Sequence, residues 1–202
     1  MHFIFIADSY APLNNSCAVQ MEDLASKFIE IGHEVTILVP SYENRIIREE
    51  SKKIIYIKIL LQIRSKSYFL RLISEFIMPY CMILNLKMGN YKMKNVEGVI
   101  SYSPSIFFSP LIKYLKITYK CRNYLILRDI FPKWAYDLGI IKNKFVYALL
   151  HYFEKKQYNI SDVVGVQTKG NLKYIKSINI KNPSCFEVLH NWLSQRTKKE
   201  FD

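Results

Sequence analysis

The sequence predicts an α/β fold, a doubly wound and mostly parallel Rossmann-like sheet of about seven strands. Short continuous apolar runs, typical of strands buried on both faces, alternate along the chain with segments of helical periodicity. The 202 residues, half of them hydrophobic, suit one such domain with a sizeable core. Because strands that alternate with helices pair in parallel through right-handed crossovers, the pattern indicates one continuous sheet.

The boundaries of the elements follow from the apolar runs and from the residues that interrupt them. Strands are expected at 2–7, 34–40, 53–60, 96–102, 123–128, 162–167 and 186–190. Helices are expected over 17–28 and 68–88, in a segment ending near 115, and over 145–160 and 171–178, while 129–140 is a loop or a short helical region. Gly32, Gly89 and Asn90 follow two of the helical patterns, as residues that end helices do.

The chain is strongly basic, with 29 lysines and arginines against 17 acidic residues and a formal net charge of +12. This balance implies an anionic partner, and we expect acidic lipid or a phosphorylated substrate. Nucleic acid is not expected, because no RNP, helix-turn-helix or zinc-finger signature is present. From Arg45 to Arg71 the chain holds eight basic residues, against two acidic ones within the segment and Glu43 just before it. Two interpretations of this segment stay open: a solvated face, or a surface that sits on acidic lipid.

The segment 68–86 is the most membrane-like part of the chain, but Arg71, Glu75 and Pro79 interrupt it. Since charges near a bilayer centre are costly, we predict a soluble amphipathic helix that can lie at an interface. The first seven residues lack the basic start and cleavage site of a signal peptide, so a cytoplasmic location is expected. The scattered cysteines form no CxxC pair and are expected to be reduced core residues; they are Cys17, Cys81, Cys121 and Cys185.

Several classes of site are excluded because their motifs are missing. The chain has no GxGxxG dinucleotide fingerprint, no GxxxxGK[ST] phosphate loop, no GxSxG elbow and no HExxH zinc motif. The four histidines lie far apart in the sequence. We therefore expect no cofactor and no metal site.

The functional site is expected at one edge of the sheet, since ligands of doubly wound folds bind beyond the carboxyl ends of the strands. The residues predicted at this edge are polar, mixed in charge and partly aromatic, which suits carbohydrate. They fall at 8–16, 101–105, 128–134, 167–170 and 190–192. Tyr102 is the aromatic candidate for substrate binding after the fourth predicted strand.

Five segments together resemble the N-terminal domain of family 4, GT-B-fold, retaining glycosyltransferases. They are FIADSYAP, IGHEVTILVP, LRDIFPKWAYDLGIIKN, EKKQYNISDVVGVQTKGNLKYI and FEVLHNW, and they extend over nearly the whole chain. The third and fourth are the specific ones, and they are similar to enzymes of bacterial O-antigen and capsule assembly, particularly L-N-acetylfucosamine transferases. The resemblance implies transfer of a sugar from a nucleotide sugar to a polyprenyl-diphosphate-linked acceptor at the inner face of the cytoplasmic membrane. An anionic, membrane-held acceptor fits a basic peripheral protein.

The resemblance assigns the catalytic candidates Arg128 and Asp129, which stand where many relatives have a His–Asp pair facing the reacting sugar. Arg128 would pair with a diphosphate, as a permanently charged bidentate donor. Asp129 would accept a proton from the acceptor hydroxyl or orient that hydroxyl. The alternative is an Arg–Asp ion pair that only fixes the loop.

The resemblance also assigns residues that bind substrate. Asn14, Asn15 and Ser16 occupy the loop where many relatives carry paired glycines near the donor phosphates. Lys133 and Trp134 are candidates for acceptor binding, with packing of Trp134 against a helix as the alternative. Thr168 and Lys169 begin a predicted helix, whose N-terminus can hold an anion. His190 and Asn191 resemble the junction between the last strand and a linker, with a hinge cap as the favoured interpretation.

We expect residues 1–192 to form this acceptor-side domain and 193–202 to form a polar tail. In the family a second Rossmann-like domain, with paired glutamates, holds the nucleotide sugar, and nothing after Trp192 is expected to form it. Since catalysis in this fold needs a cleft that closes between two domains, the chain alone is expected to transfer little or no sugar. Three interpretations stay open: a truncated transferase, one subunit of a split enzyme with a separate donor-domain chain, and a noncatalytic protein that binds a membrane surface or a lipid carrier.

Overall fold

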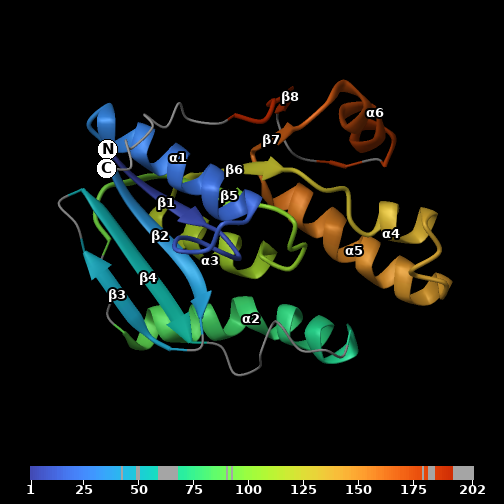
Figure 1. Ribbon diagram of the computed structural model, residues 1–202, viewed down its shortest axis with the longest axis horizontal. Helices are drawn as coiled ribbons and strands as arrows, with labels where there is room; N and C mark the ends of the chain where they lie inside the picture. The colour runs from blue at the N-terminus through green and yellow to red at the C-terminus, as the bar shows by residue number, and fades with distance from the viewer. Residues whose placement is uncertain are drawn as a thin grey trace, which may run out of the picture.

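A computed structural model gives the three-dimensional structure of the chain (Figure 1). It describes residues 1–41, 43–48, 51–58, 68–89, 91, 93–178, 180–181 and 185–192. Within these residues, helices flank one eight-stranded sheet in the order β3-β4-β2-β1-β5-β6-β7-β8. Every pair of neighbouring strands is parallel except β3 with β4. The predicted doubly wound, mostly parallel fold is confirmed.

The bounds of the elements follow the predicted ranges closely. The strands are β1 (His2–Ile6), β2 (Glu34–Ser41), β3 (Arg45–Arg48), β4 (Lys52–Lys58), β5 (Val96–Tyr102), β6 (Arg122–Leu127), β7 (Val163–Val166) and β8 (Cys185–Val188). The helices are α1 (Ser16–Glu30), α2 (Tyr68–Met88), α3 (Ser109–Tyr119), α4 (Lys133–Asp137), α5 (Lys144–Ile160) and α6 (Lys169–Ser177). The helix α4 lies within 129–140, the segment for which a loop or a short helical region is predicted.

The strand β3 is the one element that the sequence analysis did not predict. It is four residues long and antiparallel to β4, with Ile46 opposite Ile55 and Ile47 opposite Ile54. Arg45 and Arg48 at its two ends are exposed, which is how natural proteins protect the edge of a sheet. The sequence pattern did not predict this strand, because the two arginines make the segment resemble a solvated, charged surface.

Local signals explain where the helices begin and end. Asn15 is the N-cap of α1, and its side-chain oxygen accepts a hydrogen bond from the Ala18 backbone N–H at 2.9 Å. Gly32 follows α1 with φ of +86°, a conformation that favours glycine. The helix α2 continues through Pro79, as the apolar periodicity predicted.

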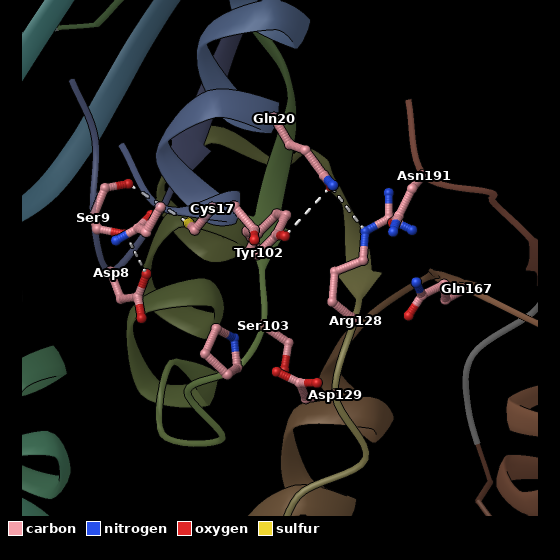
Figure 2. Close-up of a pocket in the computed structure, with 13 residues that line it drawn as sticks. Asp8, Ser9, Cys17, Gln20, Tyr102, Ser103, Arg128, Asp129, Gln167 and Asn191 are labelled. Carbon is pink, nitrogen blue, oxygen red and sulfur yellow. Dashed lines mark hydrogen bonds between the residues drawn. The ribbon is translucent and has the colours of Figure 1, made fainter. Parts of the chain in front are cut away.

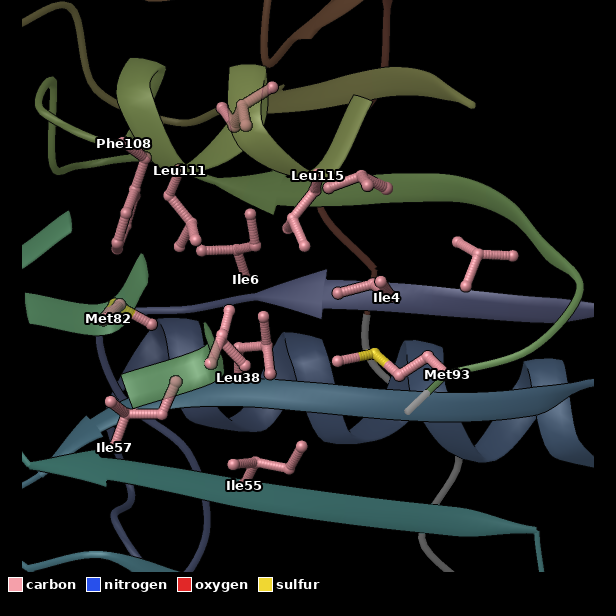
Figure 3. Packing of buried hydrophobic residues seen from close by; sticks show 14 of the residues in the cluster. Ile4, Ile6, Leu38, Ile55, Ile57, Met82, Met93, Phe108, Leu111 and Leu115 are labelled. Atoms are coloured by element: carbon pink, nitrogen blue, oxygen red, sulfur yellow. The ribbon is translucent and has the colours of Figure 1, made fainter. Parts of the chain in front are cut away.

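The inner strands of the sheet, unlike the edge strands β3 and β8, are largely buried on both faces. Along β1, Ile4 and Ile6 point to the face covered by α2 and α3, where they pack in one cluster with Leu38 and Leu111 (Figure 3). Phe5 points to the other face, which α1 covers. Helices on both faces leave the carboxyl ends of the strands as the edge where loops can build a site.

Three of the four cysteines are buried, as predicted, but Cys185 is exposed. It lies on the edge strand β8, which no further described strand covers, and this corrects the expectation that all four lie in the core. Among the described residues, no helix combines the length and apolar character that crossing a bilayer requires.

The basic segment between Arg45 and Arg71 is only partly described, and Arg64 and Lys66 lie outside the described residues, as does the predicted tail 193–202. Two of its cations have acidic partners. Lys52 contacts Glu22 at 3.1 Å, and Arg71 contacts Glu75 at 3.0 Å. The acidic-lipid interpretation of the whole segment stays a prediction.

Candidate functional site

A pocket of about 420 Å³ opens where the connections of the sheet diverge. The chain leaves β1 through α1 toward β2, and leaves β5 through α3 toward β6, on the opposite side of the sheet. Ligands of doubly wound folds bind at such a switch point. Five strand ends contribute to the lining, through Asp8 (β1), Tyr102 (β5), Asp129 (β6), Gln167 (β7) and Asn191 (β8). We call this cavity the switch-point pocket.

Arg128 is buried beside this pocket and points toward Gln20 of α1 (Figure 2). It connects the end of β6 with α1 and with the residues that follow β8. Its Nε donates to the Gln20 side-chain oxygen at 3.1 Å, and its Nη1 donates to the Leu189 carbonyl at 2.6 Å. The guanidinium lies over the Trp192 ring, 4.8 Å from the centroid. Its Nη2 is buried and has no hydrogen-bond partner among the described residues. Burial lowers the pKa of Arg128, with Tyr102 and Tyr124 acting in the opposite direction.

Asp129 is exposed and lines two cavities at once. Among the ion pairs of the described residues, none joins Asp129 to Arg128, so the structure gives the loop-fixing pair no support. The two neighbours point to different tasks. Arg128 faces protein groups, whereas the Asp129 carboxylate is accessible to a ligand.

The second cavity, of about 640 Å³, lies between α4 and α6 and shares Arg128 and Asp129 with the first. We call it the α4 pocket. Lys133 and Asp137 on α4 form an ion pair in its wall. Trp134 contacts Phe131, with ring centroids 6.1 Å apart, yet 44% of its surface is exposed. An open aromatic face beside polar groups suits a sugar ring. Packing against Phe131 covers only part of the Trp134 side chain, so packing alone does not explain this residue.

The other predicted residues are brought together only in part. Asn15 and Ser16 line the switch-point pocket, whereas Asn14 is exposed and outside its lining. The Asn15 side-chain oxygen already caps α1, which leaves its amide N–H groups for a ligand. Thr168 is the N-cap of α6, where its Oγ accepts from the Asn171 backbone N–H at 3.2 Å. Thr168 and Lys169 line neither pocket, although their neighbours Gly170 and Asn171 line the α4 pocket.

Gln20 and Trp192 are parts of the site that sequence reasoning missed. The Gln20 side-chain oxygen accepts from both Arg128 and the Tyr102 hydroxyl, and its backbone carbonyl accepts from the Trp192 indole N–H at 3.3 Å. Gln20 lies on the buried side of α1, where a polar residue needs a partner. A polar residue within the otherwise apolar stripe of this helix was the signal from which the sequence could have identified Gln20.

The chemistry of the switch-point pocket favours hydroxyl groups over multiple negative charges. Two carboxylates, Asp8 and Asp129, and one guanidinium, that of Arg128, line the pocket, and the guanidinium already has two protein acceptors. Burial raises the pKa of the Cys17 thiol, which therefore stays protonated and is a poor nucleophile. Among the described residues, no group of three or more metal-ligating side chains occurs.

A buried polar network underlies the α4 pocket. The Glu154 carboxyl group has no exposed surface, and it bonds to His151 Nδ1 at 2.7 Å and accepts from the Tyr158 hydroxyl at 2.9 Å. Burial raises the pKa of Glu154, while the bonds from His151 and Tyr158 partly offset the rise. Tyr147 stacks on His151 and on Tyr136 of α4, so the network supports the wall of the pocket.

We expect Glu154→Gln to remove a pH dependence of folding. The native carboxyl group holds its proton to higher pH than the unfolded one, so stability falls as pH rises from the ordinary glutamate value, about 4.3, toward the raised native pKa. The slope from one such group is at most about 1.4 kcal/mol per pH unit. Urea unfolding between pH 4.5 and 7.5 should show the stability of the variant gaining on the parent as pH rises. Parallel curves for the two proteins would contradict this assignment, and exposed Glu97→Gln is the matched control.

The fold and the position of the pockets define one Rossmann-like half of the GT-B glycosyltransferase fold. Sucrose-phosphate synthase of Thermosynechococcus elongatus is similar to this chain with a TM-score of 0.65 and 9% identity, over 95% of this chain and 90% of that one. Arabidopsis thaliana UGT89C1 in complex with UDP gives 0.61 and 10%, over 93% and 51%. A UDP-glucosyltransferase from Polygonum tinctorium gives 0.57 and 9%, over 96% and 52%.

At such low identity these similarities show the fold alone. The chain spans about half the length of several of these structures, including 51% of the Arabidopsis thaliana protein and 47% of a second sucrose-phosphate synthase structure. No protein-family model matches the sequence, and no curated protein matches it.

Proposed function

We propose that this chain is the acceptor-side half of a retaining glycosyltransferase of bacterial O-antigen or capsule synthesis. Its substrates would be a nucleotide sugar and a polyprenyl-diphosphate-linked acceptor at the inner face of the cytoplasmic membrane. The observation that carries the proposal is the position of Asp129, whose carboxylate is shared by two adjoining pockets at the switch point of a GT-B-like half. A group so placed can contact an acceptor in one pocket and a donor that enters the other.

The two pockets have complementary roles in this proposal. The α4 pocket, with Trp134, Lys133 and Asp137, would hold the acceptor sugar by stacking and hydrogen bonding. The switch-point pocket would receive the donor sugar through Asp8, Gln167 and Asn191. The donor nucleotide would be held by a second Rossmann-like domain, on the same polypeptide or on a partner chain.

In the reaction, the acceptor hydroxyl would form the new glycosidic bond while the bond from the donor sugar to the nucleoside diphosphate breaks, and the diphosphate would leave with the electron pair. Asp129 would accept the proton of that hydroxyl or orient the hydroxyl, while Arg128 holds the walls of the pocket together. Binding the donor and the acceptor side by side would add to the rate enhancement through proximity and orientation. Two observations support this role of Asp129. Its carboxylate is accessible, and no described side chain neutralises it through an ion pair.

Calorimetry with the chain alone tests the proposal. A water-soluble, short-chain polyprenyl-diphosphate sugar is expected to bind, and Trp134→Ala is expected to weaken that binding by about tenfold, since one stacked ring contributes roughly 1 kcal/mol or more. A nucleotide sugar is expected to bind much more weakly. Tight nucleotide-sugar binding without acceptor binding would assign this half to the donor and overturn the proposal. Acceptor binding with no transfer in any combination of domains would favour the noncatalytic lipid-carrier protein.

A further inference from the structure

The turn between α4 and α5 exposes an unusual amount of apolar surface. Leu138 is 72% exposed, Ile140 is 63% exposed and Phe145 is 88% exposed. Leu149 and Tyr152, one and two turns further along α5, are also more than half exposed. We call Leu138, Ile140 and Phe145, together with these two, the apolar corner. Positions 145, 149 and 152 share one face of α5 and form an apolar strip there, and Leu138 and Ile140 lie in the turn just before it.

The exposure of the apolar corner is imposed by an ordered backbone. The Ile140 and Ile141 N–H groups both donate to the Ala135 carbonyl, at 2.9 and 3.1 Å. Asn143 caps α5 through bonds from the Phe145 and Val146 N–H groups. On the inner side, Ile141 packs with Phe131 and Leu150 in a small cluster of its own. The fold therefore holds Ile141 inward and its apolar neighbours outward.

The unpaired charges along the chain beside the apolar corner are of one sign. Lys142 and Lys144 form no ion pair with any described residue. Both acidic residues between 133 and 156 are already committed, since Asp137 pairs with Lys133 and Glu154 is buried with His151. An exposed apolar strip whose unpaired neighbouring charges along the chain are lysines is complementary to a surface that is apolar within and anionic at its face.

The apolar corner is also adjacent to the α4 pocket. Trp134 and Asp137 line that pocket from α4, and the corner begins at the next residue, Leu138. Figure 1 shows α4 and the start of α5 at one end of the molecule, with the hairpin of β3 and β4 at the other end. A surface that contacts the corner would lie within reach of a ligand in the α4 pocket.

We propose that the apolar corner docks the protein on an anionic lipid bilayer and so presents the α4 pocket to an acceptor held in that bilayer. Phe145, Ile140 and Leu138 enter the interface, and Lys142 and Lys144 contact lipid phosphates. The second half of this statement rests on the proposed function, whereas the docking itself does not. The contact lies away from Arg45 and Arg48 on β3, the beginning of the segment for which the sequence left a lipid surface open.

Vesicle co-sedimentation tests the docking without any sugar substrate. The unmodified chain is expected to bind phosphatidylcholine vesicles that contain about a third phosphatidylglycerol, and to bind pure phosphatidylcholine vesicles far more weakly. Lys142→Gln with Lys144→Gln should lower the partition coefficient by about 30-fold. Ile140→Ser with Phe145→Ser should lower it on the order of tenfold or more, since two exposed apolar groups no longer enter the interface.

Two matched variants make the assay specific. Ile31→Ser changes an apolar side chain that is 58% exposed at the end of α1, and it should leave binding unchanged. Arg45→Gln with Arg48→Gln removes two exposed charges from β3 and should also leave binding unchanged.

Three outcomes would overturn the proposal. Loss of binding on the β3 change with no loss on the corner changes would assign the contact to the basic segment 45–71. Equal binding to neutral and anionic vesicles would remove the role of the lysines. A dimer in light scattering that the Ile140→Ser and Phe145→Ser changes dissociate, without vesicle binding, would make the corner a surface for a second copy. Failure of acceptor binding in calorimetry, with vesicle binding intact, would count against the proposed function and not against the docking.

Discussion

Replacement of Asp129 by asparagine is expected to lower sugar transfer by about 100-fold or more, because general-base catalysis contributes roughly that much. Asparagine keeps the size and the hydrogen-bonding ability of the side chain but cannot take the acceptor proton. The side chain is exposed and has no ion-pair partner among the described residues, so the free energy of unfolding should change by less than about 0.5 kcal/mol. Transfer is to be measured with the donor-binding half present, together with the urea midpoint of the chain alone.

The design of this comparison depends on Asp8, the other carboxylate of the switch-point pocket. Asp8 accepts from the Ser9 hydroxyl at 3.0 Å and lies on the opposite wall, at the end of β1. If Asp8→Asn lowers turnover a hundredfold while Asp129→Asn does not, the base is Asp8 and the assignment of Asp129 is wrong. Glu97→Gln, an exposed change at the start of β5, is the control for loss of a carboxylate far from the site.

The sequence predicted the sheet well because its signals are local. Apolar runs such as 2–7 and 34–40 need only burial on both faces, and Gly32 ends α1 through its own backbone conformation. The strand β3 was not predicted because its pairing depends on β4, and its exposed arginines gave no apolar run. Cys185 was misplaced for a related reason, since sequence pattern does not reveal which strand ends at the edge of a sheet.

The candidate site was predictable up to the rule that ligands bind at the carboxyl ends of parallel strands. That rule and the resemblance together selected candidate residues, of which the structure places Asp129, Tyr102 and Ser16 in one pocket and Trp134 in the next. The rule does not show what holds the pocket in shape. The contacts of Gln20 with Arg128 span 108 positions, and those with Trp192 span 172, so no local pattern encodes them.

These long-range contacts give Arg128 a second expected role, as the residue that holds the end of the chain against α1. Arg128→Ala is expected to destabilise the domain by about 3 kcal/mol, because charged hydrogen bonds to Gln20 and Leu189 are lost and the partly buried Leu189 carbonyl loses its donor. Hydrogen exchange should show the loss first in residues 185–192. Arg122→Ala, an exposed change at the start of β6, the strand that Arg128 follows, is the control.

The variant Arg128→Met separates the charge of Arg128 from its packing. Methionine keeps an apolar stem against Trp192 and removes the cost of burying a charge, so it should restore part of the stability that alanine loses. In a Trp134→Phe background, Trp192 is the one tryptophan of the chain, and its fluorescence reports whether the indole stays packed. A red shift with alanine and little shift with methionine is the expected pair of results. If both variants were as stable as the unmodified chain and their Trp192 fluorescence did not shift, the guanidinium would not be what holds the end of the chain against α1. The Arg128 position would then have to be explained by a ligand that reaches its unpaired Nη2.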